Sequence, residues 1–212
     1  MRRGMLLLLS LVGSLTAAAA LAFSVSGCSV LPSIKLPCRA EQTAVTVLEL
    51  RSYDGPFLED GSRRQVQGVA AVVLYNGGEQ MIEKGAVKLR QGERLLVFSY
   101  SMLPPGARLL VLESAGKPYS GEAINACWGW SVVGETDRRI QTEEAGRTAL
   151  TLTNITPNKV NEAWVYYKDY DPVQRLLVGG ITHSVHISHL LPGHRATVAA
   201  FGYLSGSSMV IQ

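Results

Sequence analysis

The sequence predicts an all-β protein, and three observations support this fold class. Short apolar runs follow one another along most of the chain, and several of them alternate apolar and polar residues with a period of two. Turn-forming residues separate these runs at roughly every 8–12 residues, which is typical of a sandwich. The second half of the chain also repeats the order of the first. We therefore expect antiparallel sheets packed as sandwiches, with no helix after the N-terminal region.

Five β-type runs account for most of the first half. They cover residues 45–50, 69–75, 86–89, 95–100 and 109–112. Turn signals such as Asn76-Gly77-Gly78 and Pro104-Pro105-Gly106 bound them, because glycine supplies positive φ and proline presets one dihedral angle. In the second half, Ala163, Val165 and Tyr167 alternate with their neighbours, so this run is expected to turn one face to a core and the other to water.

An internal repeat predicts two copies of one small β-domain. The matching stretches are Ala71–Asn76 with Ala149–Asn154 and Leu103–Gly106 with Leu190–Gly193, separated in the second copy by an insertion at about residues 169–180. Pro118, Ser120 and Gly121 cluster between the copies. We therefore place the first domain at residues 45–121 and the second at residues 122–212.

The N-terminal 27 residues have the pattern of an export signal. Arg2-Arg3 precede a nearly continuous apolar run from Met5 to Phe23, and Val25-Ser26-Gly27-Cys28 then leads into a cysteine. This stretch resembles the lipobox of bacterial lipoproteins. The resemblance implies that residues 1–27 are a removed signal peptide and that Cys28 carries the lipid. Residues 28–44, with Pro32 and Pro37, would then form the lipidated cysteine and a flexible tether.

An uncleaved membrane anchor is the alternative, because about 20 apolar residues can cross a bilayer. Both interpretations place residues 29–212 outside the cytoplasm, held at the cell membrane. Removing Arg2 and Arg3 from the 20 basic residues leaves 18, against 17 acidic ones. This near-neutral balance gives no reason to expect nucleic acid as a partner.

Two cysteines remain once Cys28 is assigned to the lipid. Cys38 and Cys127 form an even pair in a compartment that permits disulfides. The sequence leaves two alternatives open: one disulfide between the N-terminal segment and the Cys127 strand, or two buried thiols.

The repeated unit also resembles the tandem immunoglobulin-like modules of Gram-positive cell-surface lipoproteins. The stretches that carry the resemblance are Ala149–Asn154, Trp164–Tyr167, Gly179–Thr182, Leu191–Gly193 and Tyr203–Ser208. The resemblance implies two tandem immunoglobulin-like β-sandwich domains and a surface module without an assigned activity. It does not identify a ligand.

Aromatic residues gather in the second half at Trp164, Tyr166, Tyr170 and Tyr203. Because side chains alternate along a strand, some of these aromatic rings must face outward or into a domain interface. They form our candidate binding surface, since exposed aromatic side chains often anchor protein or carbohydrate partners. Cross-strand packing is the alternative.

We find no metal site, no cofactor site and no catalytic motif. All four histidines lie in residues 183–194, but on a strand His183 and His189 stand at opposite ends of one face and cannot bind the same ion. In Cys127-Trp128-Gly129-Trp130, the alternation predicts a core strand that opens the second domain, and the nearby sequence offers no histidine to activate the thiol. Carboxylates are dispersed over loops, unlike the paired acids of hydrolases.

These patterns predict a non-enzymatic lipoprotein, with the membrane as partner through its lipid and an unknown envelope protein or glycan as partner through its domains. A receptor or sensor that binds a sugar, peptide or metal with the second domain is the main alternative. It requires a concave pocket lined by Trp164, Tyr166 or Tyr170 together with polar groups from residues 169–180. An envelope hydrolase would require a histidine of residues 183–194 beside Cys127 or beside a carboxylate pair.

Overall fold

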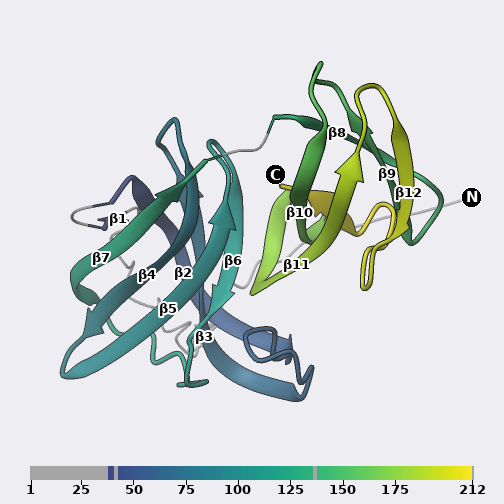
Figure 1. Ribbon diagram of the computed structural model, residues 1–212. Coiled ribbons are helices and arrows are strands. Elements are labelled where there is room, and N and C mark those ends of the chain that lie inside the picture. The colour runs from purple at the N-terminus through teal and green to yellow at the C-terminus, as the bar shows by residue number, and fades with distance from the viewer. Residues whose placement is uncertain (1–37, 41–42, 136–137, 212) are drawn as a thin grey trace, which may run out of the picture. The chain divides into compact units, whose positions relative to one another are not determined.

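The computed structural model describes residues 38–40, 43–135 and 138–211. The predicted signal peptide, Cys28 and most of the predicted tether lie outside the described residues. The described part is built from strands and contains no helix, which confirms the all-β fold class (Figure 1).

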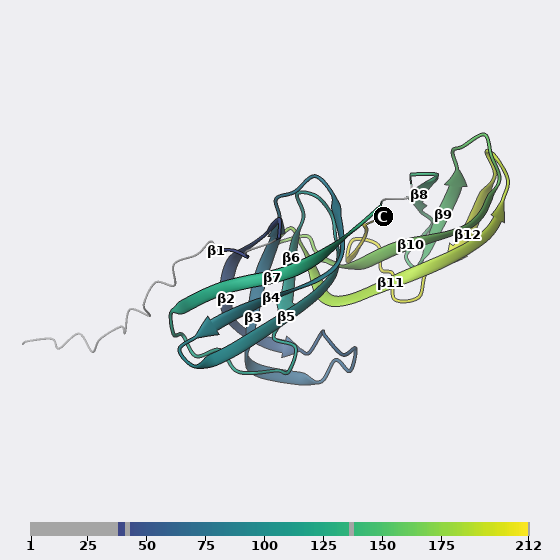
Figure 2. The ribbon, with the colours of Figure 1, turned by 60° about the vertical axis from the view of Figure 1, so that its left-hand side comes forward.

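Two sheets make up the first half, which we define as residues 38–134. One sheet has the order β1 (Cys38–Arg39), β2 (Val45–Pro56), β3 (Gln65–Asn76) and β6 (Arg108–Leu112). The other has the order β5 (Arg94–Leu103), β4 (Met81–Gln91) and β7 (Ile124–Gly134), three strands that run side by side in Figure 2. Their facing sides alternate with solvent-facing residues, as expected for a sandwich.

The second half, residues 138–211, pairs its strands in the same order. One sheet consists of β12 (Arg195–Ala199), β9 (Ala149–Asn154) and β8 (Ile140–Glu144). The other contains β11 (Leu176–Leu190), β10 (Val160–Asp171) and β13 (Ser208–Val210). The groups β2-β3-β6 and β5-β4-β7 therefore correspond to β8-β9-β12 and β11-β10-β13, strand for strand along the chain.

A parallel contact between β6 and β11 joins the two halves. Leu109 pairs with Leu177 and Leu110 with Val178, so β1-β2-β3-β6-β11-β10-β13 is one seven-stranded sheet. The side chain of Leu177 belongs to the hydrophobic core of the first half. Backbone pairing and apolar burial thus both cross the junction.

Each half has its own hydrophobic core between its two sheets. In the first half, Val72, Leu89, Phe98 and Val111 are among the buried members. In the second half, the core includes residues such as Leu152, Val165, Tyr167 and Ile187. A third cluster lies on the other side of β3 and β6, where Phe57 of the β2–β3 loop covers Ala71 and Leu112. Burial of these side chains is the main favourable contribution to folding.

The repeated asparagines have the same role in both halves. The Asn76 side-chain amide donates to the carbonyls of Gln80 and Leu103, at 2.9 and 3.0 Å. The Asn154 amide donates to the carbonyls of Asn158 and Leu190, at 2.8 and 3.0 Å. Both asparagines are buried. The internal repeat in the sequence therefore marks a hydrogen-bonded corner that closes each half.

The strand that contains Cys127 belongs to the first half. β7 pairs with β4 along its whole length, from Gly134 opposite Met81 to Ile124 opposite Gln91. This pairing corrects the expectations that a strand beginning after residue 121 opens the second domain and that the boundary falls there. The physical reason is that β7 supplies the third strand of the sheet that covers the first core, where Cys127 and Ile124 pack.

We expect Asn154→Ala to lower the free energy of unfolding by about 2–4 kcal/mol. The substitution leaves the carbonyls of Asn158 and Leu190 and the N–H of Thr156 without their partner, and each buried polar group left unpaired costs about 1–3 kcal/mol. Urea unfolding measures the loss. Asn158→Ala is the control, since that side chain is exposed, and equal losses in the two variants would contradict the assigned role.

Candidate functional site

The structure separates the four aromatic residues of the predicted binding surface. Trp164 is 48% exposed, and its ring centroid lies 4.5 Å from that of His186. Tyr166 and Tyr170 are half-buried against the core of the first half. Tyr203 is buried, because the turn after β12 folds its side chain back toward the core. Its hydroxyl donates to Glu144 at 2.6 Å. The four residues do not share one exposed face, and a binding role for Trp164 stays a prediction.

A cavity of about 540 Å³ lies where β10 and β11 meet the loop between β2 and β3. The second half contributes Asp169, Val178, Gly179, Ile181 and His183, together with Thr148 and residues 201–204; the first half contributes Leu58, Gly61 and Arg63. The predicted insertion at residues 169–180 thus lines a concave site. Phe201 and the β2–β3 loop carried no sequence signal for it, because periodicity does not reveal which loops meet.

Both polar and apolar groups line this cavity. At its polar side, Arg63 Nη2 lies 4.0 Å from Asp169 Oδ2. The His183 ring stacks on Tyr167 with centroids 5.4 Å apart, and the Tyr167 hydroxyl donates to the carbonyl of Phe201. That hydrogen bond holds the backbone of Phe201, whose side chain is 90% exposed. A small molecule with one apolar face and a polar edge fits this set of groups.

An irregularity in the β10–β11 pairing shapes the floor of the cavity. Tyr167 pairs with His183 and Asp169 pairs with Val178, so one residue of β10, Lys168, stands opposite residues 179–182 of β11. Gly179 has a φ of +82°, and a Cβ on Gly180 would overlap Glu59 Oε2. The glycine pair therefore permits the first-half loop to approach β11 closely.

Two titratable side chains, Lys168 and Glu59, lie at this irregularity. Lys168 is fully buried, and its Nζ donates to the carbonyls of Gly180 and Ile181 at 3.1 and 2.9 Å. Glu59 Oε1 accepts the N–H of Leu112 at 2.7 Å. Burial raises the pKa of Glu59 to about 7, against the opposing effect of its hydrogen bonds and of Lys168. Burial also lowers the pKa of Lys168 to about 7.

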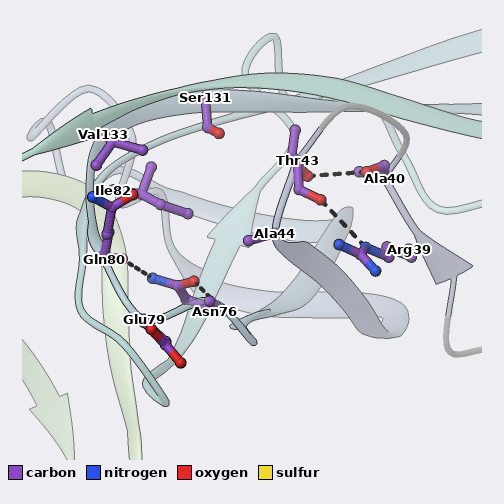
Figure 3. A pocket seen from close by; sticks show the side chains of 11 residues that line it. Arg39, Ala40, Thr43, Ala44, Asn76, Glu79, Gln80, Ile82, Ser131 and Val133 are labelled. Carbon is purple, nitrogen blue, oxygen red and sulfur yellow. Dashed lines mark hydrogen bonds between the residues drawn. The ribbon is translucent and has the colours of Figure 1, made fainter.

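Figure 3 shows a second cavity, of about 720 Å³, beside the β1–β2 turn. Three of its polar side chains bond to neighbouring backbone. Thr43 Oγ1 donates to the carbonyl of Ala40 at 3.0 Å, Arg39 Nε donates to the carbonyl of Thr43 at 3.4 Å, and the amide of Asn76 donates to Gln80. These contacts hold two turns in place. We assign this cavity a structural role.

The histidines of β11 do not converge. His183 stacks on Tyr167, and His186 stands against Trp164. Within residues 38–40, 43–135 and 138–211, no cluster of three or more histidine, cysteine or acidic side chains has the geometry to hold a metal ion.

Cys38 and Cys127 lie side by side as thiols. Cys127 Sγ is 4.0 Å from the carbonyl oxygen of Cys38, and a hydrogen bond with the Cys127 side chain lowers the pKa of the Cys38 thiol. These two cysteines, which the sequence singled out as a possible pair, lie together in the fold although 89 positions separate them in the chain. A disulfide between them stays a prediction.

None of the described segments is a helix that is long and apolar enough to cross a bilayer. Comparison of the chain with protein-family models, with curated proteins and with solved structures gives no match.

We expect the free energy of unfolding to fall as the pH rises from about 5 to about 7. Between the ordinary pKa of 4.5 and the raised pKa of about 7, folded Glu59 keeps a proton that the unfolded chain has lost. Unfolding then releases a proton, so rising pH favours the unfolded state, by up to about 3 kcal/mol over this window. Urea unfolding across this pH range measures the slope.

Glu59→Gln should abolish this contribution to the slope, because the amide does not titrate. Glu162→Gln is the control, since that side chain is exposed on β10. An unchanged slope in Glu59→Gln would show that the carboxyl group ionises equally in both states.

Proposed function

We propose that the protein is a lipid-anchored binding module on the outside of a bacterial cell membrane, built from two tandem immunoglobulin-like β-sandwiches. The observation that carries the proposal is Val25-Ser26-Gly27-Cys28, placed between an apolar export signal and a proline-containing tether. The all-β fold that follows supports it. Identical strand-pairing order in residues 38–134 and 138–211 supports the tandem arrangement.

The joined sheet supports a binding role rather than a flexible spacer. Parallel pairing of β6 with β11 connects the two halves. Ser101 adds a side-chain contact, since its hydroxyl donates to the carbonyl of Gly180 at 3.0 Å and lies 2.9 Å from that of Thr182. Such a unit presents surfaces from both halves in a fixed relation, which suits capture of an envelope protein or glycan.

Cys28→Ala should abolish incorporation of a palmitate analogue into the protein. The thiol of Cys28 is the proposed acylation site, and alanine offers no nucleophile in its place. In-gel detection of the labelled protein after expression in a bacterial host measures the incorporation. Cys38→Ala is the matched control and should label as the parent does, while equal labelling of the Cys28→Ala variant would refute the anchor.

A ligand receptor is the second candidate function, and the cavity of about 540 Å³ favours it. The cavity includes Asp169 and Gly179 of the insertion that this hypothesis required. It differs from the expected site in its aromatic residues, because Phe201 and Tyr203 line it in place of Trp164 and Tyr170.

For the receptor, a panel of disaccharides and short peptides should contain a ligand that shifts the backbone NMR signals of Gly179 and Gly202. Phe201→Ala should weaken its binding about tenfold, because it removes the exposed ring at the cavity rim. Val173→Ala, a substitution at an equally exposed position outside the cavity, is the control. Unchanged affinity in Phe201→Ala would exclude this cavity as the site.

A further inference from the structure

The outer face of the sheet β5-β4-β7 combines cations with tryptophans. On β4 the outward row is Lys84, Ala86, Lys88 and Arg90. The register places Val132, Trp130 and Trp128 of β7 beside Lys84, Ala86 and Lys88, and Ser99, Val97 and Leu95 of β5 beside Ala86, Lys88 and Arg90. We call these residues the basic–aromatic face. The opposite side of the same strands, with Val87 and Phe98, forms the first core. Figure 2 shows the three strands as one layer.

Apolar groups on this face remain in water. Trp130 is 47% exposed, Val132 39% and Leu95 36%. Trp128 is half-buried, and the guanidinium of Arg90 stands 6.0 Å from its ring centroid. Folding normally buries tryptophan side chains, so two neighbouring tryptophans on an open sheet surface are unusual. The face is therefore suited to a partner that contacts indole rings.

The cations of this face take part in no ion pair between described residues. None of the outward positions named above carries a carboxylate. The acids at the margin of the face are Glu83 at a bulge of β4, Glu93 in the following turn, and Glu135, which lines a pocket together with Glu83 and Lys84. Among the ion pairs between described residues, none involves Lys84, Lys88 or Arg90. A chain that is otherwise near neutral therefore concentrates three positive charges on one three-stranded surface.

We propose that the basic–aromatic face lies on the anionic phospholipid surface of the membrane to which the protein is anchored, an inference that rests on the proposed lipid anchor. Charge complementarity selects this partner: each Lys or Arg near an anionic bilayer increases binding about fivefold. Tryptophan supports it, because the indole ring favours the headgroup region, where its apolar body and N–H group both find partners.

The tether enters the fold beside this sheet. Cys38, the first residue of β1, contacts Cys127 of β7, with 4.0 Å between Sγ of Cys127 and the carbonyl oxygen of Cys38. Nine residues separate Cys28 from Cys38, so the lipid-bearing residue can be at most about 35 Å from β1. This length keeps the first half within reach of the headgroups, and an anchored chain meets the membrane at a high effective concentration.

The test uses the chain of residues 28–212 with Cys28→Ser, so that no lipid is attached. This form keeps every member of the three hydrophobic clusters, all of which lie within residues 38–211. Flotation with vesicles of phosphatidylglycerol and phosphatidylcholine measures its partitioning. We expect binding to the mixed vesicles, little binding to phosphatidylcholine alone, and a loss of about a hundredfold in the triple variant Lys84→Gln, Lys88→Gln, Arg90→Gln.

Matched controls lie in the second half. Arg138→Gln, Arg147→Gln and Lys159→Gln remove the same charge from exposed positions. Trp164→Ala matches Trp130→Ala, because the two rings are 48% and 47% exposed. We expect the control variants to bind as the parent does, and Trp130→Ala to bind several-fold less. Urea unfolding of each variant checks that the fold is retained.

Three outcomes would overturn the assignment. They are equal binding to neutral and anionic vesicles, an equal loss in both triple variants, and binding of a soluble polyanion such as heparin without binding to vesicles. Because this chain carries no lipid, its failure to bind leaves the palmitate result at Cys28 unaffected. Failure of the palmitate labelling would remove the anchor while the intrinsic affinity of the face is still measured.

Discussion

The junction of this protein depends on Gly180 of β11, whose carbonyl accepts a hydrogen bond from the buried Lys168 and which lies against the Glu59 side chain of the first half. β11 serves both halves: Leu177 and Val178 pair with β6 of the first half, while residues 176–178 and 183–190 pair with β10 in the second. Between these segments the ladder is interrupted, and Lys168 satisfies the carbonyls of Gly180 and Ile181. A buried ammonium is costly unless it is paired and hydrogen-bonded, so the carboxyl group of Glu59 completes the arrangement.

This constraint also builds the cavity. Leu58 precedes Glu59 in the chain, Gly61 lies two positions after it, and Asp169 follows Lys168. Leu58, Gly61 and Asp169 line the cavity. The hydrogen bonds of Lys168 to the carbonyls of Gly180 and Ile181 fix one register of β10 against β11. A slip in that register would move Val178 and His183 out of the site together.

The sequence predicted the fold class and the repeated corner, because both depend on local patterns. Asn76 and Asn154 close their corners by hydrogen bonds within 36 positions of the chain. The domain boundary depends on a longer-range effect. Residues 117–121 look like a linker, yet the neighbouring Glu113 side chain accepts the N–H groups of Val97, Ala115 and Lys117, which fastens this segment to the edge of β5. The receptor hypothesis included residues 169–180 of the cavity, but the β2–β3 loop that completes the cavity was missed, since no periodicity relates Leu58 to Asp169.

The edge of β7 is protected from pairing with another strand, while the outer face of its sheet is open. An uncharged edge strand of 11 residues invites pairing with other chains, but register shifts interrupt its ladder near both ends, at Ile82/Lys84 and Arg90/Gln91 of β4. Bulges of this kind twist an edge away from a partner strand. The outer face has no comparable device, because its three cations lack carboxylate partners and its tryptophans remain in water. The fold thus disfavours strand addition at the edge while it leaves the face available, as contact through side chains with a lipid surface requires.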